Sequence, residues 1–484
     1  MNQVRLLLTF GMLMMLGACT LGPNYVRPEL VVPMAFKEAA GWKAAEPRDE
    51  VTRGAWWELF ADATLNDLVS QVEVSNQNIR TAEAQYRQSE ALASQARAGL
   101  YPSLSGNAGM TRSQSTNLKA GSANSPVTLN SLGLSASWET DIWGKVRRQV
   151  ESGNASLQAS AANLQAAKLS AQATLAQDYF LLRVADRSHQ LLTNTVTAYQ
   201  ASLQLTRNQY AVGVAARGDV VNAEAQLKSA QAQAVDVGVQ RAQLEHAIAV
   251  LIGKPPMEFS IAQITFNPSL PDIPVGVPSA LLERRPDVAA AERTVAAANA
   301  SIGVAQAAYY PDLTLGGSFG FQSSSLGQLL SLPSRVWSLG PALAQVLFDG
   351  GLRRAQTAQA IAVYDQDVAL YRQTALTAFQ EVEDKLASLR ILEQEAGLQD
   401  EAVKAARQSV DITTNQYRAG TVSYLNVINV QTILLTDERA ALAILGNRLT
   451  AAVLLVKALG GGWDSHGLNE VVKSVAATGE SVVQ

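Results

Sequence analysis

The chain contains two related copies of one sequence unit, and this internal duplication limits it to folds built from two similar halves. The segment Asn-Gln-Tyr-Ala-Val-Gly-Val at 208–214 recurs as Asn-Gln-Tyr-Arg-Ala-Gly-Thr at 415–421, a shift of 207 positions. Gly-Leu-Tyr-Pro at 99–102 recurs as Ala-Tyr-Tyr-Pro at 308–311, a shift of 209. A unit of about 200 residues is far longer than the repeat of a solenoid, so the pattern indicates an ancient duplication of half a domain.

Small apolar residues recur at alternating steps of four and three, and this spacing predicts long packed helices. The first such stripe is Ala155, Ala159, Ala162, Ala166, Leu169, Ala173, Ala176 and Phe180. A second stripe within 220–251 reappears within 427–458, where even its one basic position, Arg241, is matched by Arg448. No Pro interrupts 144–210, so a helix there would be roughly 100 Å long. A soluble coiled-coil bundle would show the same periodicity, and the pattern alone leaves that alternative open.

Two pairs of segments between the helices alternate apolar and polar residues, which predicts two β-hairpins. The expected strands are 103–113 with 129–141, and 312–322 with 336–349. Strands of about ten alternating residues are typical of membrane barrels, although soluble hairpins remain an alternative. Four strands cannot close a barrel, and strands in lipid cannot leave an edge unpaired. A membrane location would therefore require several copies of the chain.

The N-terminus has the features of a bacterial lipoprotein signal peptide. Arg5 precedes an apolar core of about eleven residues, which is too short to span a bilayer as a helix. The following Leu-Gly-Ala-Cys sequence resembles a lipobox, in which Cys19 is lipidated and becomes the new N-terminus. Thr20 follows Cys19. An Asp at this position would resemble an inner-membrane retention signal, so Thr20 favours the outer membrane. The simpler alternative is a buried Cys near an ordinary cleavage site.

These patterns together predict how the chain is divided. No segment after the signal peptide has 18 or more uninterrupted apolar residues, so a transmembrane helix is not expected. The expected parts are a signal peptide at 1–18, a lipidated segment at 19–61, a first helix–hairpin–helix repeat at 62–252, a linker at 253–279 that forms an equatorial belt, a second repeat at 280–460 and a C-terminal tail at 461–484.

The composition argues against an enzyme. The chain has only three His and one Cys, and charged residues make up 17% of it, against roughly 25% in a typical soluble protein. No metalloprotease-like His spacing occurs, and the Gly run at 460–462 lacks the Lys of a phosphate loop. We therefore expect no catalytic site, metal or cofactor, and the net charge of −4 gives no general affinity for nucleic acid. The basic cluster Lys145, Arg147 and Arg148 is interpreted as a solvated helix start, with contact to lipid headgroups as the alternative.

Four short motifs, in order along the chain, point to one family. They are Gly-Pro-Asn-Tyr at 22–25 with Pro28, Trp-Trp-Glu-Leu-Phe-Ala-Asp at 56–62, Leu-Leu-Glu-Arg-Arg-Pro-Asp at 281–287, and Lys-Ala-Leu-Gly-Gly-Gly-Trp at 457–463. On a duplicated helix–hairpin–helix chain, this set resembles the outer-membrane efflux channels of the TolC/OprM family, in their lipoprotein (NodT-like) branch.

The resemblance implies a fold and a function. The fold would be mostly α with a membrane β-barrel: a homotrimer forms a 12-stranded barrel and a long periplasmic α-helical barrel. The protein would be a passive exit duct, lipid-anchored in the outer membrane, that exports drugs or other small toxic compounds. Its partners would be a periplasmic adaptor protein and an inner-membrane transporter of the RND type. A duct for type I protein secretion and a structural coiled-coil lipoprotein without a pore remain the alternatives.

The resemblance also assigns residues at the periplasmic end. The two helix-to-helix turns would be the tips that meet the adaptor, namely Val212, Gly213, Val214, Ala419, Gly420 and Thr421. Gly at the centre of each turn also fits a simple backbone requirement for positive φ. The pore would narrow just beyond the tips at the gate positions Asp219, Asn222, Tyr417, Arg418, Leu425, Asn426 and Asn429.

Several gate positions depart from the family pattern. Asn426 and Asn429 stand where related channels often have Asp, so Asp219 would carry the negative charge of this region alone. Fewer charges in a narrow ring focus a weaker field, which predicts weaker cation selectivity. Tyr417 would help to hold the closed tip by hydrogen bonding between helices. Arg418 is the nearest cation for a gate link, or a solvated tip charge, and Leu425 would form an apolar constriction or pack in the helix interface.

Overall fold

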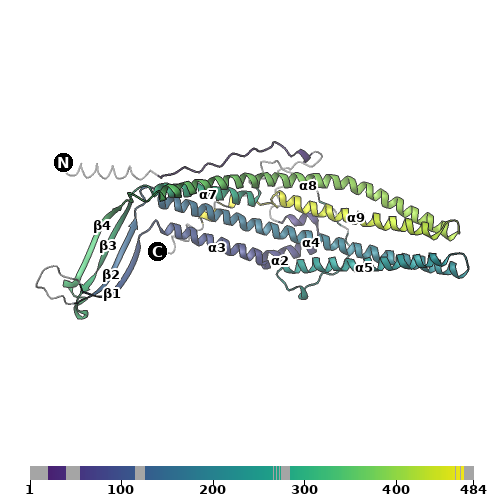
Figure 1. Ribbon diagram of the computed structural model, residues 1–484, viewed down its shortest axis with the longest axis horizontal. Helices are drawn as coiled ribbons and strands as arrows, with labels where there is room; N and C mark the ends of the chain where they lie inside the picture. Colours follow the sequence, from purple (N-terminus) through teal and green to yellow (C-terminus); the bar gives the residue numbers. More distant parts are fainter. Residues whose placement is uncertain are drawn as a thin grey trace.

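The molecule is a long bundle of helices with a small β-sheet at one end (Figure 1). The computed structural model describes residues 20–39, 55–114, 126–264, 284–463, 465–468 and 470–473, with a few single positions between 266 and 273. The expected signal peptide and Cys19 lie outside the described residues.

The helices come in pairs of equal length, as a duplicated chain should give. α4 (Lys145–Ala211) and α8 (Leu352–Arg418) have 67 residues each, α5 (Arg217–Leu251) and α9 (Tyr424–Ala458) have 35 each, and α3 (Gln77–Ala98) and α7 (Pro286–Ala307) have 22 each. The short α2 (Ala63–Ser75) precedes α3, and Asn76 between them caps α3 by accepting hydrogen bonds from Asn78 and Ile79. At 1.5 Å per residue, α4 and α8 are each roughly 100 Å long.

α4 lies at the centre of the bundle and α8 at its edge (Figure 1). α4 packs along α3, α5, α7 and α9, whereas α8 packs mainly on α7 and α9. Away from the sheet, the two coiled pairs α4–α5 and α8–α9 extend side by side to the far end of the rod. Most small residues of the predicted stripe are buried as expected, including Ala155, Ala162 and Ala173, whereas Ala166 is half-buried. Ala side chains let these helices approach closely over their whole length.

The sheet is antiparallel, with the order β1-β2-β3-β4. Its strands are β1 (Ser103–Ser113), β2 (Val127–Glu139), β3 (Asp312–Ser323) and β4 (Arg335–Ala344). The fourth strand is shorter than the expected 336–349 because the chain leaves the ladder after Ala344, and Asp349 instead accepts hydrogen bonds at the start of α8. β1 and β4 are the two edges of this sheet, each paired on one side only among the described strands.

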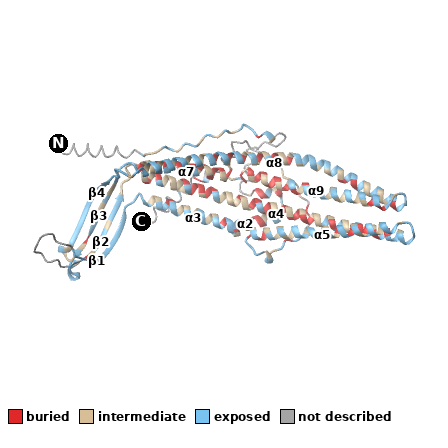
Figure 2. Cartoon of the chain, in the orientation of Figure 1, coloured by how far each residue is buried: buried red, intermediate tan, exposed pale blue. Residues whose placement is uncertain are grey.

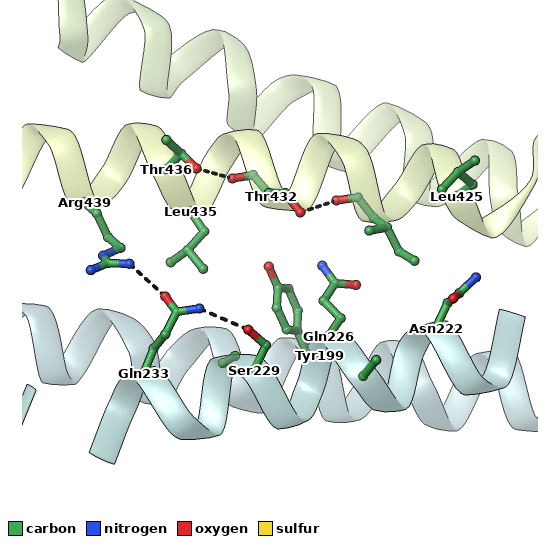
Figure 3. Close-up of a pocket in the computed structure, with 13 residues that line it drawn as sticks. Tyr199, Asn222, Gln226, Ser229, Gln233, Leu425, Thr432, Leu435, Thr436 and Arg439 are labelled. Atoms are coloured by element: carbon green, nitrogen blue, oxygen red, sulfur yellow. Dashed lines mark hydrogen bonds between the residues drawn. The ribbon is translucent and has the colours of Figure 1, made fainter. Parts of the chain in front are cut away.

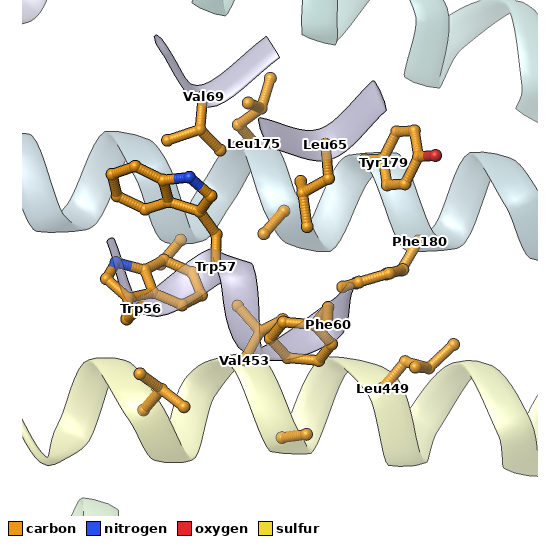
Figure 4. Close-up of a cluster of buried hydrophobic side chains, with 14 of the residues drawn as sticks. Trp56, Trp57, Phe60, Leu65, Val69, Leu175, Tyr179, Phe180, Leu449 and Val453 are labelled. Carbon is orange, nitrogen blue, oxygen red and sulfur yellow. The ribbon is translucent and has the colours of Figure 1, made fainter. Parts of the chain in front are cut away.

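The largest core cluster lies near the middle of the rod, where the N-terminal region packs across the helices. Figure 4 shows Trp56, Trp57 and Phe60, which belong to the short helix η4 (Trp56–Phe60), between the long helices α4 and α9. Leu65 and Val69 of α2 complete the cluster. The indole of Trp56 is 2% exposed, and its Nε1 donates to Gln172 Oε1 at 3.1 Å. The Trp-Trp motif thus packs between helices of the first and second halves of the chain and joins them.

α9 is the single described helix that is long and apolar enough to cross a membrane. Its most apolar 18-residue window has a mean hydropathy of 1.5, and 44% of that window is buried inside the protein. Its buried side chains pack on α4 and α8. Packing between long helices therefore accounts for part of the apolar character of α9.

Candidate functional site

The β-sheet has one apolar and one polar face. On the first face, Leu134 and Trp337 lie opposite Phe319 in the neighbouring ladders, and Leu339 lies opposite Gly317. These side chains are open to the surroundings: Trp337 is 71% exposed and Leu339 is 81% exposed. An exposed apolar face of this kind fits the lipid side of a membrane barrel.

The opposite face is lined by small polar side chains. Ser105 and Ser135 hydrogen bond through their hydroxyls at 2.8 Å, and Ser318 and Ser338 do so at 2.7 Å. Gly and Thr occupy many neighbouring positions on this face, and Figure 2 shows that the sheet is mostly exposed. The face is therefore wettable, as the lumen of an aqueous duct requires.

Both strand-to-helix junctions are built by the same Asp–Arg pair. Asp141 accepts hydrogen bonds from the backbone N–H groups of Val146 and Arg147, and its Oδ2 lies 3.1 Å from Arg147 Nε. Asp349 repeats the arrangement with Arg353, at 2.6 Å. The hydrogen bond from Arg353 lowers the pKa of Asp349, so this carboxylate stays charged to a lower pH than an ordinary Asp. Each pair fixes the angle at which a long helix leaves the sheet.

The expected tip residues lie together at the end of the rod that is farthest from the sheet (Figure 1). Gly213 and Gly420 have φ of 80° and 74°, a backbone conformation that glycine adopts without strain. Val212 and Val214 are 75% and 66% exposed, and Ala419 and Thr421 are exposed as well. Two turns that present apolar side chains to solvent form a surface suited to another protein.

The gate positions divide into buried and exposed residues. Tyr417 is buried, and its hydroxyl donates to Thr206 Oγ1 at 3.3 Å, so it links α8 to α4 within one protomer. Burial raises its pKa. Asp219 accepts a hydrogen bond from the backbone N–H of Ala216 at 3.2 Å and so caps α5. Arg418 is exposed, and it donates to Asn415 at 3.3 Å rather than reaching another helix.

A groove separates α5 from α9 just above the tips (Figure 3). It has a volume of about 590 Å³ and is lined by both polar and apolar side chains, among them Asn222 and Leu425, two of the expected gate residues. Leu425 is 56% exposed, and Asn426 and Asn429 are exposed beside it. One hydrogen bond crosses the groove, from Arg439 Nη1 to Gln233 Oε1 at 2.8 Å. Beside the groove, the Tyr199 hydroxyl donates to the Gln431 carbonyl at 3.4 Å, and a buried cluster that includes Tyr199, Tyr424 and Val427 joins the two coiled pairs.

The sequence did not predict a buried ionic network near the middle of the rod. Asp186 pairs with Arg183 at 3.2 Å and with Arg241 at 2.7 Å. Both guanidinium groups also donate to the chain that follows α5, Arg183 to the Ala262 carbonyl at 2.7 Å and Arg241 to the Ile261 carbonyl. The network therefore fastens the start of the expected linker to α4 and α5. The one available signal was Arg241, a charged residue in an apolar stripe.

The structure also corrects the interpretation of the basic cluster at the start of α4. Arg148 is 4% exposed and not solvated, and it donates to the carbonyl groups of Leu21 and Gly22. Lys145 pairs with Glu139 and Asp312, at 3.1 and 3.5 Å. No group of three or more His, Cys, Asp or Glu side chains is placed to hold a metal ion in the part of the chain that the structure describes.

Comparison with known proteins decides the family. The family model described as outer membrane efflux protein matches residues 68–254 and 277–461. The chain belongs to this family of outer membrane efflux proteins. It is 29% identical over 466 residues to the toluene efflux pump outer membrane protein TtgC of Pseudomonas putida, and 93% of each chain is covered. It is also 29% identical over 462 residues to the cation efflux system protein CusC of Escherichia coli, with 94% of this chain and 98% of CusC covered.

The outer-membrane channel OprN has the same fold in its solved structure, with a TM-score of 0.87 and 30% sequence identity. The match covers 92% of this chain and all of OprN. The expected fold class is therefore confirmed: a mostly helical protomer with a long helical barrel and a β domain, as in the trimeric outer-membrane efflux channels. The outer membrane efflux protein described here is an exit duct that spans the outer membrane and extends into the periplasm.

Proposed function

We propose that three copies of this chain close their sheets edge to edge into one 12-stranded barrel, and that their helices form one continuous duct. The observation that carries this proposal is the pair of edges β1 and β4 on a sheet with an exposed apolar face. Backbone groups at such edges cannot remain unpaired in lipid. Native mass measurement of the detergent-solubilised protein should give three copies; a stable monomer in detergent that still conducts ions would contradict the proposal.

The tips supply the contact with a periplasmic adaptor, which connects the duct to an inner-membrane transporter of the RND type. The support is the pair of exposed apolar turns at the end farthest from the membrane. Val212→Glu together with Ala419→Glu should abolish cross-linking to the adaptor in cells while leaving trimers intact. Leu330→Glu changes an exposed apolar residue at the opposite end of the rod and is the matched control. Unchanged adaptor cross-linking in the tip variant would overturn the assignment.

The gate has a weak charge ring, and Asp219 is its one acid among the seven gate positions. Asn426 and Asn429 are exposed beside the groove and add no charge. In single-channel recordings, Asn426→Asp and Asn429→Asp should shift the reversal potential toward cation selectivity, because each adds three negative charges per trimer. Gln394→Glu, at an exposed position on α8 away from the tip, is the control. Strong cation selectivity of the unchanged protein would contradict this account of the gate.

Cys19 is the lipid anchor, and the support is the Leu-Gly-Ala-Cys sequence after a short apolar core. Radiolabelled palmitate should label the wild type and not Cys19→Ser; equal labelling would exclude this anchor.

The cargo consists of small toxic compounds, and the inner-membrane transporter chooses among them. This follows because relatives named for toluene and for cations are equally similar to this chain. The duct performs no chemistry of its own, and co-purification with secretion ATPases alone would overturn the efflux role.

A further inference from the structure

The N-terminal strap, which we define as residues 20–39, runs along the outside of the rod from the sheet toward the middle (Figure 1). Strap residues bond with three helices that are far away in sequence. The strap's Pro23 carbonyl accepts a hydrogen bond from Asn299 of α7 at 3.0 Å. Tyr25 donates to Glu292 of α7, and Arg27 donates to the hydroxyl of Tyr371 on α8 at 3.0 Å. An irregular segment held at so many points is bound in a specific way, as a peptide is bound by a receptor.

The first residues of the strap occupy the most specific part of this surface. Arg148 donates to the carbonyl of Leu21 at 3.0 Å, to the carbonyl of Gly22 at 3.1 Å and to Asn24 Oδ1 at 3.0 Å. The same guanidinium pairs with Glu151 at 2.7 Å. A buried charge is tolerated only when it is paired and hydrogen-bonded. Arg148 therefore depends on the strap for acceptors that compensate its burial, and the strap is held by the three hydrogen bonds that Arg148 donates.

Gly303 of α7 has no side chain, and the strap backbone lies against it at this point, which we call the Gly303 notch. A Cβ added at Gly22 would come within 2.4 Å of the Gly303 Cα atom, and a Cβ added at Gly303 would come within 2.9 Å of the Leu21 carbonyl oxygen. Both distances are shorter than real side chains allow, so only glycine at these two positions permits the contact. The groove thus selects the strap by backbone approach as well as by hydrogen bonding.

The duplication gives the groove residues counterparts in the other copy. α4 and α8 are equally long and correspond at a shift of 207, so the position equivalent to Arg148 in the second copy is Ala355, which is exposed. The position equivalent to Gly303 in the first copy is Ser94, which is exposed and has a side chain where the notch would be. The Arg and the Gly of the groove are thus both absent from the counterpart positions, which lie on α8 and α3, two helices that do not pack along each other within the protomer.

We propose that Arg148, Asn299, Glu292 and the Gly303 notch form a peptide-binding groove that captures the residues immediately after the lipid anchor and so fixes where around the barrel the acyl chains enter the membrane. This proposal rests on the anchor assigned to Cys19 under the proposed function. Covalent connectivity limits the anchor to about 7 Å from Leu21. The Leu21 N–H donates to the Trp143 carbonyl at 3.2 Å, directly after β2. Trp143 stacks near Tyr310, with ring centres 4.8 Å apart, and such rings favour the membrane interface.

The test separates the strap from the body of the protein after folding. A protease site is placed within 41–53 of the full chain, a purification tag is placed at the C-terminus, and the purified trimer is cut in detergent. The strap fragment should remain bound to the wild type and to two controls, Arg354→Ala, which removes an exposed Arg at the start of α8, and Ser94→Leu. It should be lost from Arg148→Ala and Gly303→Leu, with dissociation at least about tenfold faster, since each change removes or blocks a charge-assisted contact.

A variant on the strap itself covers the case in which a change in the body prevents folding. Gly22→Val blocks the same contact and leaves every helix unchanged, so its fragment should also be lost. Cys19→Ser should retain its fragment in detergent, because the groove binds polypeptide and not lipid. Retention of the fragment therefore tests the groove alone, whereas palmitate labelling tests the lipid anchor. Loss of the fragment from the cut wild type, or equal retention by Gly22→Val, would overturn the proposal.

Discussion

The two halves of the duplicated chain have the same helix lengths and very different surroundings. α4 buries 23 of its 67 residues within one protomer, whereas α8 buries only nine of its 67. The exposed face of α8 carries large apolar side chains along most of its length, namely Ile361, Leu370, Leu376, Ile391, Leu398 and Ile412. One copy has therefore become the interior helix of the protomer and the other its edge. The exposed apolar side chains of α8 are what a neighbouring protomer would cover.

Equivalent residues have also acquired different partners. Arg183 of α4 is 1% exposed and fastens the linker after α5, whereas its counterpart Arg390 of α8 pairs with Glu38 of the strap at 2.5 Å. Both members of the pair use a cation to attach irregular chain to a long helix. The buried member carries the larger energetic consequence, because a buried charge or carbonyl that loses its partner is not compensated by water. The duplication thus provides a counterpart position in α8 for each residue of α4.

The largest expected difference between the halves is at this Arg pair. Arg183→Ala leaves Asp186 with one cation fewer and the Ala262 carbonyl without its donor, and should lower the free energy of unfolding by about 3 kcal/mol. Arg390→Ala removes a partly exposed pair and should cost less than about 1 kcal/mol. Thermal unfolding of the two purified variants measures both effects. Equal destabilisation would mean that the burial difference between α4 and α8 does not control their stability.

A smaller, pH-dependent difference is expected at Asp178 of α4, whose counterpart in α8 is Lys385. Burial raises the pKa of Asp178 to about 6, above the ordinary value of about 3.9. The folded state therefore binds this proton more tightly than the unfolded state, and stability is lost as pH rises from about 4 through about 6. Asp178→Asn should stabilise the protein by about 1–2 kcal/mol at pH 8 and have little effect at pH 4. The same gain at both pH values would rule out titration as its cause.

The smallest expected difference is at the two tips. Tyr417 is buried and donates to Thr206, whereas its counterpart Tyr210 is 47% exposed. Tyr417→Phe removes one neutral hydrogen bond, worth about 1 kcal/mol, and should make the channel open more often in single-channel recordings. Tyr210→Phe should change neither stability nor opening. A change in channel opening in Tyr210→Phe but not in Tyr417→Phe would show that the tip of α4, and not that of α8, controls opening.

The sequence was sufficient for features that follow from periodicity. The stripe of Ala155 and its neighbours predicted the long helices, and alternation predicted the strands, because burial repeats along each element. Contacts that join distant segments gave no such signal. Arg148 was interpreted as a solvated helix start because nothing in its own helix shows that the strap, more than 100 residues earlier, supplies its acceptors. The end of β4 was missed because Val346 and Phe348 continue the apolar pattern after the ladder stops.

Conductance tests the central claim of a passive duct most directly. The purified trimer is placed in a planar bilayer without adaptor, transporter or nucleotide, alongside a variant with a loosened tip that combines Tyr417→Phe with Arg439→Ala. The second change removes the hydrogen bond across the groove between α5 and α9. We expect discrete steps of ion current from this variant, with larger or more frequent openings than in the wild type. The absence of current from folded trimers of both proteins would contradict the duct.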